Sequence, residues 1–245
     1  MVIAIWGRDG AGKSTLADAL GNLFSKYEIT VIIDTDLTQP TLPVRLAGQI
    51  FKHDSSLGRA VSGIGISDVC SYLHQHPKQK RLFYAGLTDR DEYLSYEIGL
   101  ESDNRAQDFI EGCRETADIV ILDLSGQRTD PFVPCALIHA DKIIVPVTTD
   151  VQGVCWYGAV KPLIQSMDAQ GRIIPVAAMV SKYHDMKSIE KAADIHFVSA
   201  LPFVKEFRQT NGTGISPLGG STPAAMRYAK ESIRLHALLK GADEA

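Results

Sequence analysis

Residues 7–14 read Gly7-Arg8-Asp9-Gly10-Ala11-Gly12-Lys13-Ser14 and match the pattern G-x-x-x-x-G-K-[ST] of a phosphate-binding P-loop. Residues 2–6, directly before the loop, are apolar and rich in β-branched side chains, which predicts a buried strand. After the loop, apolar side chains recur at helical spacing at Leu16, Leu20, Leu23 and Phe24. This order of strand, loop and helix predicts a nucleotide site, because glycines let backbone N–H groups turn inward and a helix N-terminus attracts phosphate.

The motif assigns a chemical role to each part of the loop. Lys13 is expected to reach the β and γ phosphates and to act in catalysis, and the Ser14 hydroxyl is expected to bind Mg²⁺. The loop residues expected to contact the nucleotide are Arg8, Asp9, Gly10, Ala11, Gly12, Lys13, Ser14 and Thr15.

Length and composition suit one α/β domain spanning residues 1–245, since 45% of the residues are hydrophobic and 22% are charged. A formal net charge of −4 excludes a global basic field that would attract nucleic acid or anionic lipid. The chain contains no run of about 18 apolar residues, and it enters the first strand without a signal peptide. Its cysteines are widely spaced and form no CxxC pair. We therefore expect a cytoplasmic protein without a disulfide framework or zinc site.

Strand-like and helix-like patterns alternate, which predicts a doubly wound, mostly parallel sheet with helices on both faces. Besides 2–6, strands are expected at 30–34, 81–85, 119–124, 142–147, 173–180 and 196–199. Helices are expected near 14–26, 67–75, 103–116, 131–139, 151–168 and 222–240. Pro162 is expected to kink or split the helix at 151–168. The irregular stretch 35–66 is expected to be either a partner-binding switch segment or an ordinary long loop.

Acidic residues follow two of the expected strands. Asp34-Thr35-Asp36 ends the strand at 30–34, and Asp123 ends an aliphatic run and begins a D-x-x-G pattern that closes at Gly126. In a P-loop site one such carboxylate holds water on Mg²⁺ and another orients an attacking water. We therefore expect Asp34 and Asp123 at the metal together with Ser14. The alternative is that Asp34 and Asp36 only cap the segment that follows.

The residues after the strand at 173–180 indicate which nucleobase the site prefers. GTPases carry N-K-x-D at this place, and its aspartate accepts hydrogen bonds from guanine, whereas this chain reads Ser181-Lys182-Tyr183-His184. Because no carboxylate is present, the sequence favours ATP over GTP, with Ser181 and Lys182 expected beside the nucleotide.

Taken together, these segments resemble the ParA/MinD family of P-loop ATPases, the deviant Walker A group of the SIMIBI class. The resemblance spans nearly the whole chain. It rests on residues 7–15, Asp34-x-Asp36, 81–88, Asp123-x-x-Gly126, 140–146, and Leu201-Pro202 followed by Asn211-Gly212. Within the family, the chain looks most similar to the CpaE/TadZ-like subgroup associated with pilus localisation.

The resemblance implies a function and a set of partners. Family members bind ATP and Mg²⁺, form face-to-face dimers around two nucleotides, hydrolyse ATP slowly, and act as positional switches for plasmids, division sites, flagella or pili. By position, it implies that Asp36 orients the attacking water and that Pro202 lines the adenine. It also implies an ATP-state homodimer, a protein partner from a localisation system, and a place in the cytoplasm, at the membrane periphery or at a cell pole. Basic residues between 201 and 240 leave DNA or a membrane surface open as partners, the alternative being a solvated face.

One part of the loop departs from the family pattern. The signature lysine, five residues before the P-loop lysine, is Arg8 here, and Asp9 stands where glycine is usual. In the family that lysine crosses the dimer interface to the partner's phosphates, and an arginine fork also suits phosphate. Asp9, however, brings negative charge to a phosphate site. The alternative is that Arg8 and Asp9 form an exposed pair of little energetic weight.

Three functions follow from these features. The first is a regulatory ATPase whose ATP-bound form dimerises and recruits partners. The second is a small-molecule kinase, for which the loop at 10–15 is suitable although no arginine-rich lid segment is present. The third is a nucleotide-gated scaffold with little hydrolysis, which Arg8 and Asp9 favour. The sequence favours the first function, because the acidic patterns at 34–36 and 123–126 suit a switch.

Overall fold

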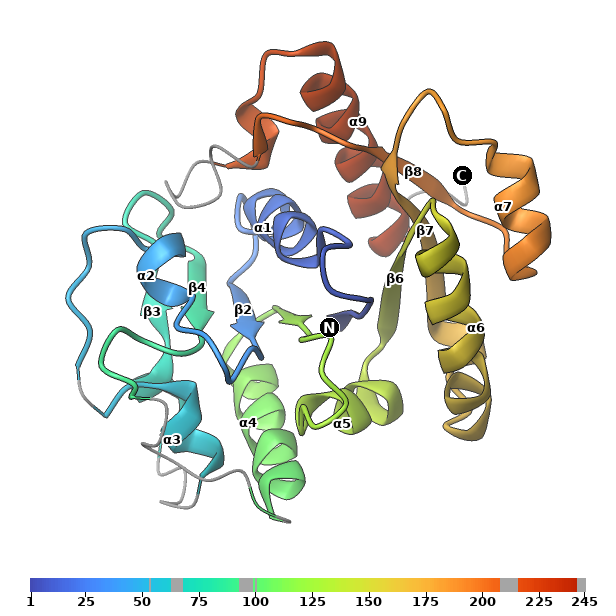
Figure 1. Cartoon of the computed structure of the whole chain (residues 1–245). Coiled ribbons are helices and arrows are strands. Elements are labelled where there is room, and N and C mark those ends of the chain that lie inside the picture. The colour runs from blue at the N-terminus through green and yellow to red at the C-terminus, as the bar shows by residue number, and fades with distance from the viewer. Residues whose placement is uncertain (53, 63–67, 93–98, 100, 208–215, 242–245) are drawn as a thin grey trace.

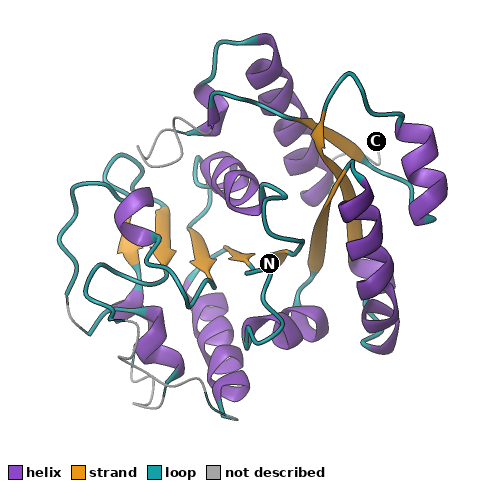
Figure 2. Cartoon of the chain, in the orientation of Figure 1, coloured by secondary structure: helices purple, strands orange, loops and turns teal. Residues whose placement is uncertain are grey.

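The computed structural model describes residues 1–52, 54–62, 68–92, 99, 101–207 and 216–241. These residues form an eight-stranded sheet in the order β3-β4-β2-β5-β1-β6-β7-β8, with helices on both faces (Figures 1 and 2). Every neighbouring pair is parallel except β3 and β4, which are antiparallel. The predicted fold class, a doubly wound and mostly parallel sheet, is confirmed. Asn211-Gly212, part of the family resemblance, lies outside the described residues.

Most expected strands are present at or close to their predicted bounds. The strands are β1 (Val2–Ile5), β2 (Thr30–Asp34), β3 (His74–Gln75), β4 (Leu82–Ala85), β5 (Ile119–Asp123), β6 (Lys142–Thr148), β7 (Ile173–Val180) and β8 (Ser199–Pro202). The last strand was predicted at 196–199 and instead begins at Ser199, because its pairing with β7 runs from Ser199 to Pro202.

The helices also follow the predicted order. They are α1 (Lys13–Phe24), α2 (Leu42–Arg45), α3 (Leu57–Val61), α4 (Ser102–Thr116), α5 (Phe132–His139), α6 (Val151–Ser166), α7 (Met186–Ala193) and α9 (Pro223–Leu239). Short 3₁₀ turns lie at Val69–Tyr72, Gln170–Arg172 and Pro217–Gly219. The sequence did not predict α2, α3 or α7. None of the described helices is long and apolar enough to cross a membrane.

One expected helix is absent, and the split that was one of the two outcomes expected at Pro162 does not occur. Of the segment predicted as a helix at 67–75, the described residues 68–75 do not form an α-helix: Asp68 caps a single 3₁₀ turn by accepting from the Cys70 N–H, and the chain then pairs with β4 as β3. Pro162 does not split α6, which is continuous from Val151 to Ser166. Pro162 and Gly158, four residues earlier, are both exposed, so water can satisfy the carbonyl that loses its partner.

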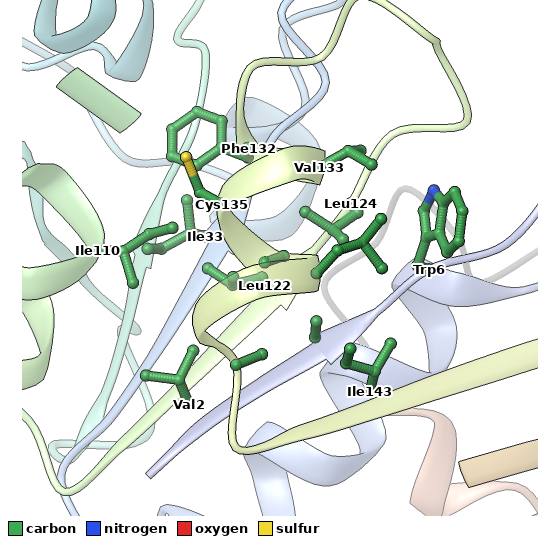
Figure 3. Close-up of a cluster of buried hydrophobic side chains, with 14 of the residues drawn as sticks. Val2, Trp6, Ile33, Ile110, Leu122, Leu124, Phe132, Val133, Cys135 and Ile143 are labelled. Atoms are coloured by element: carbon green, nitrogen blue, oxygen red, sulfur yellow. The ribbon is translucent and has the colours of Figure 1, made fainter. Parts of the chain in front are cut away.

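The core lies on both faces of the sheet. Side chains alternate along β1, so that Val2 and Ala4 pack with α4 and α5, whereas Ile3 and Ile5 pack with α1 and α9. Figure 3 shows the first of these clusters, with Trp6, Leu122 and Phe132 gathered between the sheet and α5. Because the central strands are buried on both faces, their carboxyl ends form a rigid edge on which a site can be built.

Candidate functional site

The loop between β1 and α1 has the backbone that phosphate binding requires. Gly10 and Gly12 adopt φ angles of 77° and 81°, a left-handed conformation that side chains disfavour. Gly12 is the N-cap of α1, whose first residue is Lys13. The loop therefore turns at glycines and presents a helix N-terminus, which is the arrangement that binds a phosphate anion.

A cavity of about 600 Å³ opens at this loop. Residues 9–15 of the loop line it, together with the ends of β2 and β5 and the turn at 124–127. The rest of the lining is apolar and is made by Ala178, Met179, Leu201, Pro202, Phe203, Val204, Phe207 and Tyr228. Because β1 lies between β5 and β7 in the sheet, the loop stands between the acidic strand ends and this apolar wall. The cavity thus offers N–H donors, a lysine and carboxylates beside aromatic and aliphatic surface, which together suit a nucleotide.

The cavity brings together most of the predicted site residues. Those among its lining are Asp9, Gly10, Ala11, Gly12, Lys13, Ser14, Thr15, Asp34, Asp36, Asp123 and Pro202. Arg8, Ser181 and Lys182 are not part of the lining. The Ser181 N–H donates to His184 Nδ1, and the Lys182 ammonium lies 5.0 Å from the ring centre of Tyr183.

Lys13 is buried and bends back over the loop. Its Nζ donates to the Arg8 carbonyl at 3.1 Å and lies 3.5 Å from Asp9 Oδ1. The Asp9 side chain is 81% exposed and also reaches the opposite wall, since a Cβ added to Gly126 would lie 2.2 Å from its Oδ1. Because Asp9 is solvated and its contact with Lys13 is long, the pair contributes little stability, and an incoming phosphate can replace Asp9 as the partner of Lys13.

Arg8 points to the N-terminus of α6. Its guanidinium donates to Thr148 Oγ1 at 3.0 Å, to Asp150 Oδ2 at 3.4 Å and to Gln152 Oε1 at 2.6 Å. The pair of Arg8 with Asp9, which the sequence left open, is therefore replaced by two separate pairs: Arg8 with Asp150, and Asp9 with Lys13. The tertiary contact arises because β6 lies beside β1 and ends near the loop.

The acidic residues at the ends of β2 and β5 line the same cavity. Asp34 and Asp123 are register partners at the ends of their strands, and both are buried. Burial raises the pKa of each carboxyl, and Arg45 partly offsets this effect. Asp34 accepts from the Asp36 N–H and from Thr41 Oγ1, at 3.1 and 2.6 Å. Asp34 therefore caps the segment that follows, as the alternative expected, and also lines the cavity; its role at a metal stays a prediction.

Asp36 stands one step further along the same edge. Its Oδ1 accepts from the N–H of Thr38 at 2.9 Å and from the hydroxyl of the same threonine. The carboxylate is thus held by its own turn while it faces the cavity. This is a suitable position for a group that orients water near a phosphate.

Two buried charged residues were missed by the sequence reasoning. Arg45, at the end of α2, contacts Asp18, Asp34 and Asp123. Asp130 joins the residues that follow β2 and β5 to the start of α5. It contacts Thr35 Oγ1 and accepts from the Ser125 N–H at 3.1 Å and the Phe132 N–H at 2.8 Å. Burial raises the pKa of Asp130 to about 6. The pattern of Asp-Pro before the apolar run at 132–137 could have identified Asp130 as a helix cap; nothing local identifies Arg45.

The donor set fits a magnesium ion. Ser14, Asp34 and Asp123 all line the cavity, and Asp34 and Asp123 are register partners, so hydroxyl and carboxylate oxygens are present at one place. Mg²⁺ prefers such oxygens and retains water and phosphate ligands. In the described part of the chain, no group of three or more His, Cys, Asp or Glu side chains could hold a metal by itself. The residues therefore suit a metal that arrives with a nucleotide.

Comparison with known proteins identifies the fold. Protein-family models and curated protein sequences gave no match. Among solved structures, a putative plasmid partition protein from Borrelia burgdorferi bound to AMPPNP has a TM-score of 0.76 at 17% identity, with 98% of each chain covered. MinD complexed with Mg-ADP from Pyrococcus horikoshii has a TM-score of 0.73 at 15% identity, covering 100% of this chain and 99% of that one. The MinD cell division protein of Aquifex aeolicus has a TM-score of 0.72 at 17% identity, covering 96% of each. The chain has the fold of the MinD and ParA-family ATPases, as its motifs predicted.

Proposed function

We propose that this protein is a regulatory ATPase of the ParA/MinD type, which binds Mg-ATP and acts as a switch in the positioning or partitioning of a cellular structure. One observation carries the proposal: a single cavity joins a phosphate-binding loop, two buried carboxylates and an apolar wall. The shared fold supports it, since ATPases of cell division and plasmid partition are built the same way.

Each residue of the cavity has a task in this proposal. Lys13 releases Asp9 and binds the β and γ phosphates, while loop N–H groups neutralise the remaining charge. Ser14, with Asp34 and Asp123 behind it, would hold Mg²⁺, which when bound supplies positive charge to the phosphates. Asp36 orients a water for attack on the γ phosphate. The base lies against the apolar wall that includes Pro202.

The first test is nucleotide affinity, measured by titration calorimetry for ATP, ADP and GTP with Mg²⁺. We expect ATP to bind more tightly than GTP, and Lys13→Ala to lose at least tenfold in ATP affinity, because the substitution removes a charged phosphate contact of about 1.5–3 kcal/mol. Lys78→Ala, an exposed lysine outside the cavity, is the matched control. Tighter binding of GTP, or equal binding by the Lys13→Ala variant, would contradict the proposal.

The second test concerns dimerisation. Arg8 is held by side chains at the N-terminus of α6, so it must leave them to reach the phosphates of a second copy. We expect light scattering to give a dimer with Mg-ATP and a monomer with Mg-ADP, and Arg8→Ala to abolish the dimer. Arg105→Ala, which breaks a surface pair on α4, is the control. A molar mass that is the same with Mg-ATP and Mg-ADP would overturn the proposed dimer around two nucleotides.

A nucleotide-gated scaffold with little hydrolysis is the second candidate. It is favoured by the contacts of two loop side chains. Arg8 pairs with Asp150 at the N-terminus of α6, and Asp9 lies against Gly126, so neither side chain supports phosphate transfer in this arrangement. Steady-state phosphate release separates the two: tight ATP binding with no measurable turnover selects the scaffold. Transfer of the γ phosphate to an acceptor would instead select the small-molecule kinase.

The proposal also covers the binding partner of the protein, its cellular location and its subgroup within the family. We place the protein in the cytoplasm or at a membrane surface or cell pole, with a protein partner of a localisation system, and keep the CpaE/TadZ-like subgroup as a prediction. DNA or lipid binding through the basic C-terminal segment is tested with a triple alanine variant of Lys205, Arg227 and Lys230. Unchanged binding to DNA and to anionic vesicles would exclude that segment. Arg208, the remaining residue of interest there, lies outside the described residues.

A further inference from the structure

Arg45 is a buried cation that contacts the acidic residues of the site. It is the last residue of α2, and its side chain is only 7% exposed. Its Nη1 lies 2.9 Å from Asp18 Oδ1 on α1, and its Nη2 lies 3.1 Å from Asp34 Oδ2 on β2. The same Nη2 also donates to Asp123 Oδ2 on β5. One guanidinium thus joins three carboxylates from three different elements.

The arrangement holds Arg45 firmly. Its guanidinium lies 5.7 Å from the ring centre of Tyr84, and the Tyr84 hydroxyl donates to the same Asp18 oxygen at 3.2 Å. Buried charges persist only when they are paired and hydrogen-bonded, so the three carboxylates and the arginine stabilise one another. An arginine is charged at every accessible pH, so this partner does not switch off.

The cluster is nevertheless short of positive charge. Three carboxylates face one guanidinium, which leaves up to two negative charges that Arg45 does not balance. The excess lies at the cavity, which Asp34 and Asp123 line together with Lys13 and Ser14. A divalent cation that arrives with a nucleotide would balance it. The two carboxylates that this cation requires, Asp34 and Asp123, are the ones that Arg45 already binds.

We propose that Arg45 is a positioning residue of the metal subsite: it holds Asp34 and Asp123 in place before Mg²⁺ enters and then competes with Mg²⁺ for their charge. Arg45 thereby sets the Mg²⁺ concentration at which nucleotide binds tightly. Because Arg45 ends α2, Mg²⁺ binding also loosens the attachment of α2 to the sheet. The inference rests on the proposed nucleotide function of the cavity.

Two substitutions change the charge of the cluster in opposite directions. Arg45→Met removes the competing cation and makes the subsite more negative, so Mg²⁺ should bind more tightly. Asp18→Asn removes a carboxylate that does not line the cavity and makes the subsite less negative, so Mg²⁺ should bind more weakly. Arg45→Lys keeps the charge and should behave more like the unmodified protein. Arg105→Met, on the surface of α4, is the matched control for loss of an arginine.

The experiment measures the affinity of the full chain for a fluorescent ATP analogue as a function of free Mg²⁺. We expect the half-saturating Mg²⁺ concentration to fall about threefold or more in Arg45→Met and to rise about threefold or more in Asp18→Asn, since charges interact strongly where water is largely excluded. A role in folding alone would lower stability without moving these midpoints in opposite directions. Midpoints that stay unchanged, or that move the same way in both variants, would overturn the proposal.

Two further measurements keep the result decisive. If circular dichroism shows that Arg45→Met does not fold, Asp18→Asn decides alone, and an unchanged midpoint there overturns the proposal. Thermal stabilisation by nucleotide at one subsaturating Mg²⁺ concentration is measured in parallel and should be smaller in Asp18→Asn than in the unmodified protein. If the unmodified protein binds no nucleotide at any Mg²⁺ concentration, the proposed function fails; if it binds nucleotide and the midpoints do not move, only the role of Arg45 fails.

Discussion

Replacing Asp130 with asparagine should remove a pH-dependent loss of stability. Asp130 is 6% exposed and accepts hydrogen bonds from Thr35 Oγ1, Ser125 N–H and Phe132 N–H. Burial outweighs these bonds and raises the pKa of its carboxyl from 3.8 to about 6. The folded protein therefore binds more protons at this residue than the unfolded chain does between pH 4 and pH 6.

The sign and the size of the effect follow from linkage. Because the folded-state pKa is raised, the contribution of Asp130 to the free energy of unfolding falls as the pH rises through this window and is constant above it. Each pKa unit corresponds to about 1.4 kcal/mol, so the loss between pH 4 and pH 7 is roughly 2 kcal/mol. Asparagine does not ionise and has no such slope. The stability of Asp130→Asn relative to the unmodified protein should therefore increase by roughly 2 kcal/mol over this range.

Urea unfolding followed by circular dichroism at several pH values between 4 and 7 measures this difference. Lost hydrogen bonds add an offset that does not vary with pH, so only the change with pH is used. Asp108→Asn, at an exposed position of α4, is the control and should show no comparable change. A stability difference that is constant across the range would show that Asp130 ionises normally, and the reasoning from burial would then be wrong.

Three further substitutions test the site and its supports. Gly153→Ala should destabilise the protein by about 3 kcal/mol or more, because the new Cβ would lie 2.0 Å from the Thr148 carbonyl oxygen, which is backbone and cannot move aside; a thermal melt that matches the unmodified protein would contradict this. Gly12→Ala should cost about 1–2 kcal/mol of strain at φ 81° and should weaken nucleotide binding in calorimetry, whereas unchanged affinity would show that the loop tolerates the side chain. Tyr228→Phe should stabilise the nucleotide-free protein by about 1 kcal/mol, because the buried Tyr228 hydroxyl has no hydrogen-bond partner among the residues that the structure describes; a less stable variant would show that the hydroxyl is satisfied.

Much of the fold could be predicted because its signals are local. The apolar run at 119–123 and the alternation of strand and helix patterns require only the hydrophobic effect and backbone geometry, which act over a few residues. The segment at 67–75 shows the limit of this reasoning. There, the choice between helix and strand was made by pairing of His74 with Tyr84 in β4, a contact outside the segment.

In the candidate site, too, some features could be predicted from local signals and others could not. The loop residues and the carboxylates Asp34 and Asp123 could be located because parallel strands align their carboxyl ends at one edge, so residues at strand ends meet. The direction of Arg8 could not be predicted. Its nearest side-chain partners, Thr148 and Gln152, are more than a hundred positions away in the chain, and nothing in the loop itself selects α6 over the cavity.

The sequence by itself determined the class of the molecule: a parallel sheet with a phosphate-binding loop at the carboxyl end of its first strand, and acidic residues at the same edge. Only the tertiary structure decided how the charges pair. Arg45 meets Asp18 across 27 positions and Asp123 across 78. Such contacts depend on how α2 packs onto the finished sheet. A buried charge must meet oppositely charged partners there, and no local sequence pattern shows which residues these are.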